Sequence, residues 1–266
     1  MDPTEMLTLA RRSLMGATER TAELLAAAPD SSVLAQRCEW SLREVAAHLI
    51  TGAPMFADMA NGIPGPATSL EPGYVKVFCE RRIADLPEAD PVKLSRLLLD
   101  AVEGFLDTTI DRPGDDPVTF QAGLSHTLFG LVGIYLGEVL LHGYDMAAAL
   151  GRPWPIDPGE ASLVLAAYTP LFAVRAHPER TRGLTAAFGI ELRGAGAMTA
   201  RFTDGAFGVE PAGGAVDATL SADPVAFLMV GSGRLSRYEA VALGGLAVGG
   251  NRPDLAFDFP TLFVYA

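Results

Sequence analysis

Three ionisable side chains lie close together in an otherwise apolar stretch of the sequence, "GEVLLHGYDMAAALG", which runs from residue 137 to residue 151. Glu138 and His142 are four residues apart, so in a helix both side chains project from the same face. Asp145, three residues further on, joins that face. Burying such groups is costly unless each has a partner, and carboxylates and imidazoles are common metal ligands. The spacing therefore predicts part of a metal site.

A third ligand is expected from a different helix, because catalytic zinc takes three protein ligands and leaves one coordination position open. His48 lies in the apolar segment "VAAHLI", where Val45 and Leu49 indicate a side that faces the core. A buried imidazole without a partner would be costly there, and a metal ion would supply that partner. We therefore predict His48, Glu138 and His142 as the ligands of a divalent metal, zinc or another.

Each of these residues also has a purely structural interpretation. Glu138 and His142 could form a solvated helical pair, and His48 could be a hydrogen-bonded core histidine. For Asp145 three interpretations stay open: a metal ligand, a partner that holds His142 in one tautomer, or a polar residue near a helix end. Two histidines and a carboxylate also describe the non-haem iron triad, although that triad usually lies on strands.

Four helical stretches must position these residues. Apolar residues at helical spacing predict helices over residues 4–28, 41–61, 75–106 with a break near "LPEADP", and from 125 or 127 to 151. Ser41 followed three residues later by Glu44 is a capping-box signature, so we assign Glu44 to the helix start rather than to a metal. His126 and His177 fall near loops or helix ends and are expected at the surface. Residues 1–155 are thus predicted to form an all-α four-helix bundle.

The pattern changes after "PWPIDPGE". A further helix is expected over residues 161–174, and the alternating, glycine-punctuated segments "LTAAFGIELRG", "AMTARFTDGAFGVE" and "VDATLSA" predict strands. Asp204 and Gly205 form a hairpin-turn signal. Asp223 followed by Pro224 marks the start of another helix. Residues 156–266 are therefore predicted to form a small α+β domain.

Composition excludes several classes of function. The 266-residue chain carries 20 Lys and Arg against 32 Asp and Glu, a formal net charge of −12, which argues against a nucleic-acid partner. The start of the chain lacks the apolar core of a signal peptide, and the most apolar run is interrupted by charged residues before it could span a bilayer. Cys38 and Cys79 have neither disulfide-framework nor zinc-knuckle spacing. We expect a cytoplasmic monomer or homodimer with small-molecule partners and no membrane contact.

Two segments resemble the mycothiol-dependent maleylpyruvate isomerase family. "EWSLREVAAHLI" is similar to the family's "gWtvre-x-x-aHl" segment, and "GEVLLHGYDMAAALGRP" resembles its "E-x-x-x-H-x-x-D-x-x-x-A-l-g" segment. "VDATLSADPVAFLMVGSGR" resembles the family's C-terminal part more loosely. The resemblance implies a DinB-like four-helix bundle followed by a sterol-carrier-like α+β domain. It also implies His48, Glu138 and His142 as metal ligands, with Asp145 as the acidic position after them. The chain departs from the family pattern at Tyr135, where relatives often carry a basic residue.

The resemblance further implies a metal-dependent enzyme that uses mycothiol as a thiol cosubstrate. Such an enzyme would be a thiol-dependent isomerase or an S-transferase that acts on a small electrophilic metabolite. Arg234 is the candidate catalytic residue, because the resemblance places an important arginine in the C-terminal domain; Arg201 is the alternative, and Arg234 could also be a solvated surface residue. The alternative function is a non-catalytic carrier or sensor that binds an apolar ligand in the C-terminal domain, in a pocket lined by Phe227, Leu228 and Met229.

Overall fold

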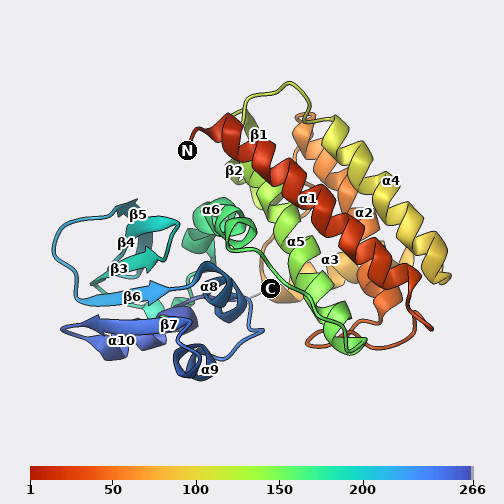
Figure 1. Ribbon diagram of the computed structural model, residues 1–266. Coiled ribbons are helices and arrows are strands. Elements are labelled where there is room, and N and C mark those ends of the chain that lie inside the picture. The colour runs from red at the N-terminus through yellow and green to blue at the C-terminus, as the bar shows by residue number, and fades with distance from the viewer. Residues whose placement is uncertain (265–266) are drawn as a thin grey trace. The chain divides into compact units, whose positions relative to one another are not determined.

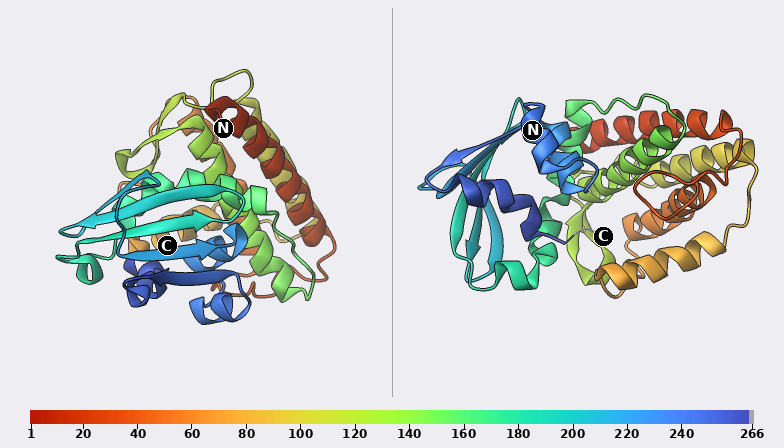
Figure 2. Two further views of the ribbon diagram at one scale, coloured as in Figure 1. Left: turned by 60° about the vertical axis from the view of Figure 1, so that its left-hand side comes forward. Right: turned by 90° about the horizontal axis from the view of Figure 1, so that it is seen from below.

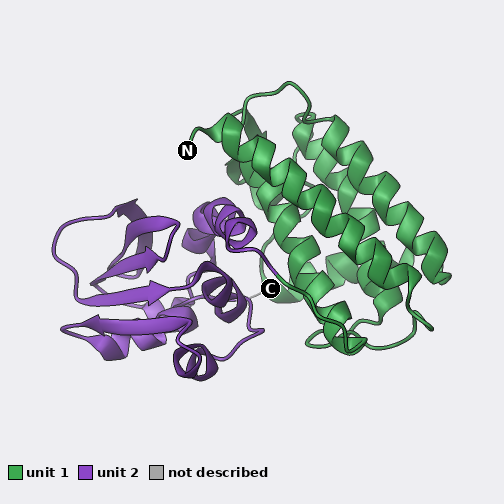
Figure 3. Ribbon diagram, in the orientation of Figure 1, with its two compact units in different colours: residues 1–155, 266 green, residues 156–265 purple. Residues whose placement is uncertain are grey.

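Two compact units divide the chain, one comprising residues 1–155 and the other beginning at residue 156. They are seen in a computed structural model (Figures 1 and 3), which describes residues 1–264. The first unit is helical and the second contains a sheet, as the sequence predicts. None of the helices in residues 1–264 is long and apolar enough to cross a membrane.

The first unit is built from long helices: α1 (Pro3–Ala26), α2 (Leu42–Ala60), α3 (Pro72–Ala84), α4 (Pro91–Asp107) and α5 (Leu128–Ala149). The helices α1 and α2 each pack against both α4 and α5, whereas α3 packs against α2 (Figure 2). A short antiparallel hairpin, β1 (Pro117–Thr119) and β2 (Ser125–Thr127), encloses the turn η1 (Gln121–Gly123) and precedes α5. Phe56, Phe105 and Tyr135 bring α2, α4 and α5 together, with ring centroids 4.7 to 5.8 Å apart.

The predicted capping box at the start of α2 is confirmed. The Ser41 hydroxyl accepts a hydrogen bond from the Glu44 amide at 3.3 Å, and the Glu44 carboxylate accepts one from the Ser41 amide at 2.8 Å. The hydrogen bonds from Ser41 hold the pKa of Glu44 below its usual value. The box satisfies amide groups that a helix start otherwise leaves without partners, and it fixes the beginning of the helix that carries His48.

The start of α5 decides between the two predicted starts of this helix and corrects the expectation for His126. Thr127 caps the helix by accepting a hydrogen bond from the Gly130 amide at 3.1 Å, so the later of the two predicted starts is right and Ser125 lies in β2. His126 is buried rather than at the surface. A side chain at Gly130 would overlap the His126 ring, so the glycine leaves the space that the imidazole fills. The ring also contacts Phe120 edge-on, with centroids 6.1 Å apart.

Trp154, from the segment that follows α5, packs against the C-terminal half of this helix. Its indole NH donates to the Leu140 carbonyl at 2.9 Å. The ring lies so close to Gly143 that a Cβ at this position would overlap it. The glycine next to His142 thus permits a close approach of the chain that follows the helix.

The second unit is a five-stranded sheet with helices. Its elements are α6 (Pro158–Arg175), α7 (Pro178–Thr181), β3 (Ala186–Leu192), β4 (Gly196–Thr203), β5 (Ala206–Pro211), β6 (Ala218–Ala222), α8 (Pro224–Gly231), α9 (Arg237–Ala242), β7 (Leu246–Gly250), α10 (Pro253–Asp258) and η2 (Phe259–Leu262). The strand order is β5-β4-β3-β6-β7, in which only β3 and β6 pair in parallel. His177 lies half-buried immediately before α7.

Local signals in the second unit are confirmed. Asp204 and Gly205 have positive φ angles of 50° and 84° between β4 and β5, the backbone that a two-residue hairpin of this type requires. The Asp223 carboxylate caps α8 by accepting hydrogen bonds from two amides of its first turn, and Pro224 follows it. On one face of the sheet, Phe188 and Phe202 pack with Phe259 and Phe263 from the C-terminal segment.

Candidate metal centre

Side chains from α2 and α5 meet at one point in the first unit. The His48 Nε2 atom lies 3.2 Å from Glu138 Oε2, and the His142 Nε2 atom lies 3.6 Å from the same oxygen. One ligand atom from each of the three residues lies within 4.8 Å of the other two. The side chains are 19%, 34% and 13% exposed for His48, Glu138 and His142. The cluster is therefore sheltered but open on one side.

The spacing of these atoms fits a divalent metal ion. Zinc binds imidazole nitrogen and carboxylate oxygen at about 2.0–2.2 Å, so the ligands of a tetrahedral ion lie roughly 3.3 Å apart. The two distances to Glu138 Oε2, 3.2 and 3.6 Å, already approach that value. Three ligands of this kind leave one coordination position for a thiol or a substrate oxygen.

The Glu138 carboxylate and the His48 imidazole shift each other's pKa values in the direction that favours their charged forms. Burial by itself raises the pKa of Glu138, but hydrogen bonding to His142 and His48 and the charges of both rings outweigh it, so the pKa of this carboxyl lies below its usual value. For His48, burial lowers the pKa, and interactions with Cys79 and Glu138 raise it above its usual value. A metal ion entering the site must therefore displace a proton that is held more firmly than on a free imidazole.

Asp145 lies behind His142. Its carboxylate is fully buried, and Oδ2 lies 3.6 Å from His142 Nδ1, the ring nitrogen that faces away from Glu138. A carboxylate in this position favours the tautomer with the proton on Nδ1, which leaves the Nε2 lone pair for a metal. This proximity agrees with the second of the three interpretations of Asp145, a partner that holds His142 in one tautomer.

Two further side chains lie against the cluster and are not among the predicted site residues. The ring of Trp40 lies against both histidines, with centroids 5.1 Å from His48 and 6.0 Å from His142. Its position directly before the Ser41 cap could have placed it at this end of α2. Cys79 interacts with His48 from α3. Nothing local indicates that contact, because it depends on how α3 packs against α2.

Tyr135 lies one turn before Glu138, at the position where the chain departs from the pattern of the family that it resembles. Its hydroxyl donates to the Leu49 carbonyl at 2.7 Å, and the side chain is buried. Burial and the charge of Glu138 raise its pKa. Tyr135 is thus part of the core between α2 and α5.

The predicted arginines lie in the second unit, whereas the three candidate ligands lie in the first. Arg234 follows α8 and its guanidinium donates to the Ser232 carbonyl at 3.3 Å. Arg201 lies on β4 in an ion pair with Glu210, its Nε 3.3 Å from a carboxylate oxygen.

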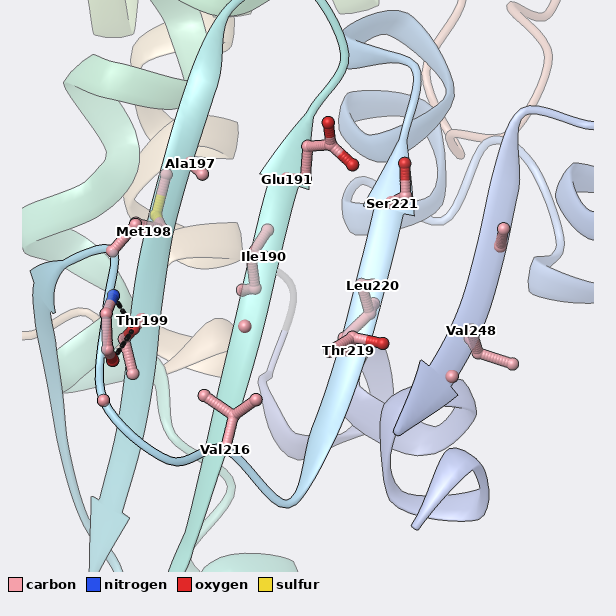
Figure 4. A pocket seen from close by; sticks show the side chains of 16 residues that line it. Ile190, Glu191, Ala197, Met198, Thr199, Val216, Thr219, Leu220, Ser221 and Val248 are labelled. Carbon is pink, nitrogen blue, oxygen red and sulfur yellow. Dashed lines mark hydrogen bonds between the residues drawn. The ribbon is translucent and has the colours of Figure 1, made fainter. Parts of the chain in front are cut away.

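A pocket of about 430 Å³ lies on the sheet of the second unit (Figure 4). Small residues dominate its lining, with strands β3, β4, β6 and β7 on one side and the loop over residues 212–216 on the other. The Thr199 hydroxyl donates to the Gly213 carbonyl at 3.1 Å and ties this loop to β4. The expectation that Phe227, Leu228 and Met229 line an apolar pocket is wrong for this one: Leu228 and Met229 are buried in the core of the unit.

Comparisons with known proteins identify relatives of this arrangement. Residues 11–147, just over half of the chain, match the family model described as the mycothiol maleylpyruvate isomerase N-terminal domain. Two solved structures share the fold, that of the mycothiol-dependent maleylpyruvate isomerase (17% identity, TM-score 0.53) and that of a mutant of it (15% identity, TM-score 0.55). Each match covers 94% of this chain and 93% of the other. No curated protein matches the chain in sequence.

Proposed function

The chain belongs to the mycothiol-dependent maleylpyruvate isomerase family, and we propose that it is a metal-dependent enzyme that uses mycothiol as its thiol cosubstrate. Its substrate would be a small electrophilic metabolite, and the reaction either a thiol-dependent isomerisation or an S-transfer. One observation carries the proposal: the convergence of one ligand atom each from His48, Glu138 and His142 within 4.8 Å.

The architecture supports the same proposal. We infer that α1, α2, α4 and α5 form a DinB-like four-helix bundle, because α1 and α2 each pack on both of the other helices. We also infer that the second unit is sterol-carrier-like. In a helical bundle, metal sites are built from side chains of facing helices that project inward, as those of α2 and α5 do here.

The proposed chemistry uses a thiolate as nucleophile. A divalent cation at the site, zinc or another, supplies the positive charge that keeps a thiol deprotonated near neutral pH. The sulfur forms a bond to one carbon of a conjugated double bond, and the π electrons move onto the conjugated carbonyl. Rotation about the resulting single bond and loss of the sulfur restore the double bond in the other configuration. In an S-transferase the carbon–sulfur bond is kept, and the α-carbon of the enolate takes up a proton from water.

The residues around the site have separate tasks in this scheme. Asp145 orients His142 through Nδ1, and the Trp40 ring covers the two histidines and limits the access of water. Arg234 is proposed to bind an anionic group of substrate or thiol.

The proposal is tested by an isomerisation assay with maleylpyruvate. Zinc-loaded protein and chelator-treated protein are compared, each with and without mycothiol, and the cis and trans products are followed by NMR. Activity is expected only when zinc and thiol are both present, and the variant His142→Ala should lose it. His177→Ala is the matched control, because it makes the same change at a half-buried histidine directly before α7 that has no proposed role in the reaction. Isomerisation that is indifferent to the chelator would contradict the metal dependence.

A second candidate function is favoured by the pocket on the sheet. A carrier or sensor would bind an apolar ligand in the roughly 430 Å³ between β3, β4, β6, β7 and the loop over residues 212–216. Native mass spectrometry of the purified protein distinguishes the two functions. A carrier is expected to retain an apolar ligand, and that ligand should stay bound when the metal is removed.

A further inference from the structure

Arg82 on α3 has an unusual environment for a charged side chain. It is half-buried, and its guanidinium donates to the Met55 sulfur at 2.8 Å and lies 5.6 Å from the Phe78 ring centroid. Within residues 1–264 it takes part in no ion pair. Thioether sulfur is a weak acceptor, and a guanidinium offers five NH groups in a planar fork. Most of its capacity to donate hydrogen bonds is therefore unused.

The neighbours of Arg82 place it beside the candidate metal centre. Met55 follows His48 by seven residues on α2, which is two turns along the same face. Cys79 precedes Arg82 by one turn on α3 and interacts with His48. Tyr135, whose side chain lies within electrostatic range of Arg82, precedes Glu138 by one turn of α5. Of these neighbours, Cys79 interacts with a candidate ligand, and Met55 and Tyr135 lie on the two helices that carry the ligands.

The groups around Arg82 compensate for its charge only weakly. Burial lowers its pKa, opposed by weaker electrostatic effects of Cys79, Tyr135 and Asp85. The guanidinium still remains protonated at neutral pH, because its ordinary pKa exceeds 12. The neighbouring arginine Arg81 is exposed at the surface instead. Arg82 is thus a partly desolvated cation that feels the charge of Asp85 but, within residues 1–264, forms no ion pair with a carboxylate.

We propose that Arg82 binds a carboxylate of the substrate and thereby selects organic acids for the His48–Glu138–His142 site. The fork of the guanidinium matches a carboxylate in a bidentate arrangement. The inference rests on the proposed function for the reaction, but the binding of the acid can be measured without turnover.

The test compares a charged probe with an uncharged one. Maleate carries two carboxylates on a conjugated double bond, and dimethyl maleate is its neutral diester. Their binding is measured by calorimetry to the parent, Arg82→Gln, Arg82→Lys and the control Arg81→Gln, each in zinc-loaded and chelator-treated form. The zinc content and thermal midpoint of every variant are recorded beside the binding constants.

Arg82→Gln is expected to weaken maleate binding roughly ten- to a hundredfold, without altering zinc content or the binding of the diester. The maleate affinity of Arg82→Lys should lie between those of the parent and Arg82→Gln, since lysine keeps the charge and loses the fork. If Arg82→Gln does not fold, the comparison of Arg82→Lys with the parent tests the role of Arg82. Arg81→Gln should bind maleate as the parent does. Equal affinity of the parent and Arg82→Gln, or a parent that does not bind maleate, would overturn the role of Arg82. A parent that holds no metal contradicts the proposed function instead. In that case the ratio of the maleate affinities of the parent and Arg82→Gln, measured without zinc, decides whether Arg82 binds the carboxylate.

Discussion

The two units differ in the kinds of side chain that their folds bring together. In the first unit, helix packing brings two imidazoles and a carboxylate within 4.8 Å of one another, with Asp145, Cys79 and Trp40 around them. In the second unit, the pocket on the sheet is lined mainly by small side chains and backbone, and Glu191 is the one titratable residue among the lining residues. The first unit therefore brings chemically reactive side chains together, whereas the second provides a pocket with few such side chains. If the protein is an enzyme, its chemistry should depend on the first.

Among the variants that distinguish the two units, the largest loss of metal affinity is expected at Glu138, whose carboxylate contacts both histidines. Glu138→Gln keeps the size of the side chain but removes the charge that the metal and both rings share. Metal affinity should fall by more than the roughly 10- to 100-fold typical of losing an outer hydrogen-bond partner. Competition with a fluorescent zinc chelator measures this fall.

The matched control for that variant is Glu191→Gln, which makes the same change in the pocket of the second unit. It should leave metal affinity at the value of the parent. If both variants weakened binding equally, the metal would not belong to the first unit.

A smaller effect is expected from Asp145→Asn, which keeps the shape of a fully buried side chain. An asparagine can present its amide to His142 Nδ1 and so no longer favours one tautomer. We expect metal affinity to fall by roughly 10- to 100-fold. Asp223→Asn is the control from the second unit, because asparagine caps a helix about as well as aspartate. Unchanged affinity in Asp145→Asn would make this residue purely structural.

The sequence predicts local features better than contacts between elements that are distant in the sequence. The Ser41 capping box and the Asp204–Gly205 turn are confirmed, because each depends on side chains and backbone within a few residues. The convergence of His48 with the α5 residues follows from two helical spacings and the cost of burying polar groups. His126 shows the limit, since its burial requires the missing side chain of Gly130.

Other members of the site lie beyond the reach of local patterns. Cys79 interacts with His48, and Arg82 contacts Met55, only because α3 packs against α2, and no spacing within the sequence encodes that packing. Likewise, the pocket on the sheet arises where small residues of β3, β4, β6 and β7 meet under a loop. The apolar run on α8 is the more obvious signal in the sequence, but its Leu228 and Met229 are buried in the core of the unit.

The two units also contain comparable capping boxes, Ser41 with Glu44 and Ser236 with Glu239. Replacing either serine by alanine is expected to lower the free energy of unfolding of its unit by about 1 kcal/mol, measured by urea denaturation. Only Ser41→Ala should also weaken zinc binding, because its helix carries His48. A loss of zinc binding in Ser236→Ala would contradict the assignment of the site to the first unit.

The smallest expected effect is the pH dependence of the metal-free protein. The raised pKa of His48 stabilises the fold below about pH 6.5, the value of a free imidazole, and this contribution is lost as the pH rises through the raised value. The lowered pKa of Glu138 stabilises the fold above about pH 4.3 and is lost as the pH falls through the lowered value. The thermal midpoint should therefore peak between these limits.

Zinc provides the control for the pH experiment. Because the metal takes the place of the proton on His48, the zinc-loaded protein should not lose stability as the pH rises from 6.5 to 8. The same alkaline decline in both forms, followed by scanning calorimetry, would show that the stabilising proton is not on a metal ligand.

The most direct test of the metal centre is elemental analysis of the purified protein beside His48→Ala and His142→Ala, with His177→Ala as a control from the second unit. After purification in metal-supplemented buffer without chelator, the parent and the control should each hold about one divalent metal ion per chain, and the two ligand variants should hold none. A parent that carries no metal under these conditions would contradict the account. Equal metal content in all four proteins would contradict it as well.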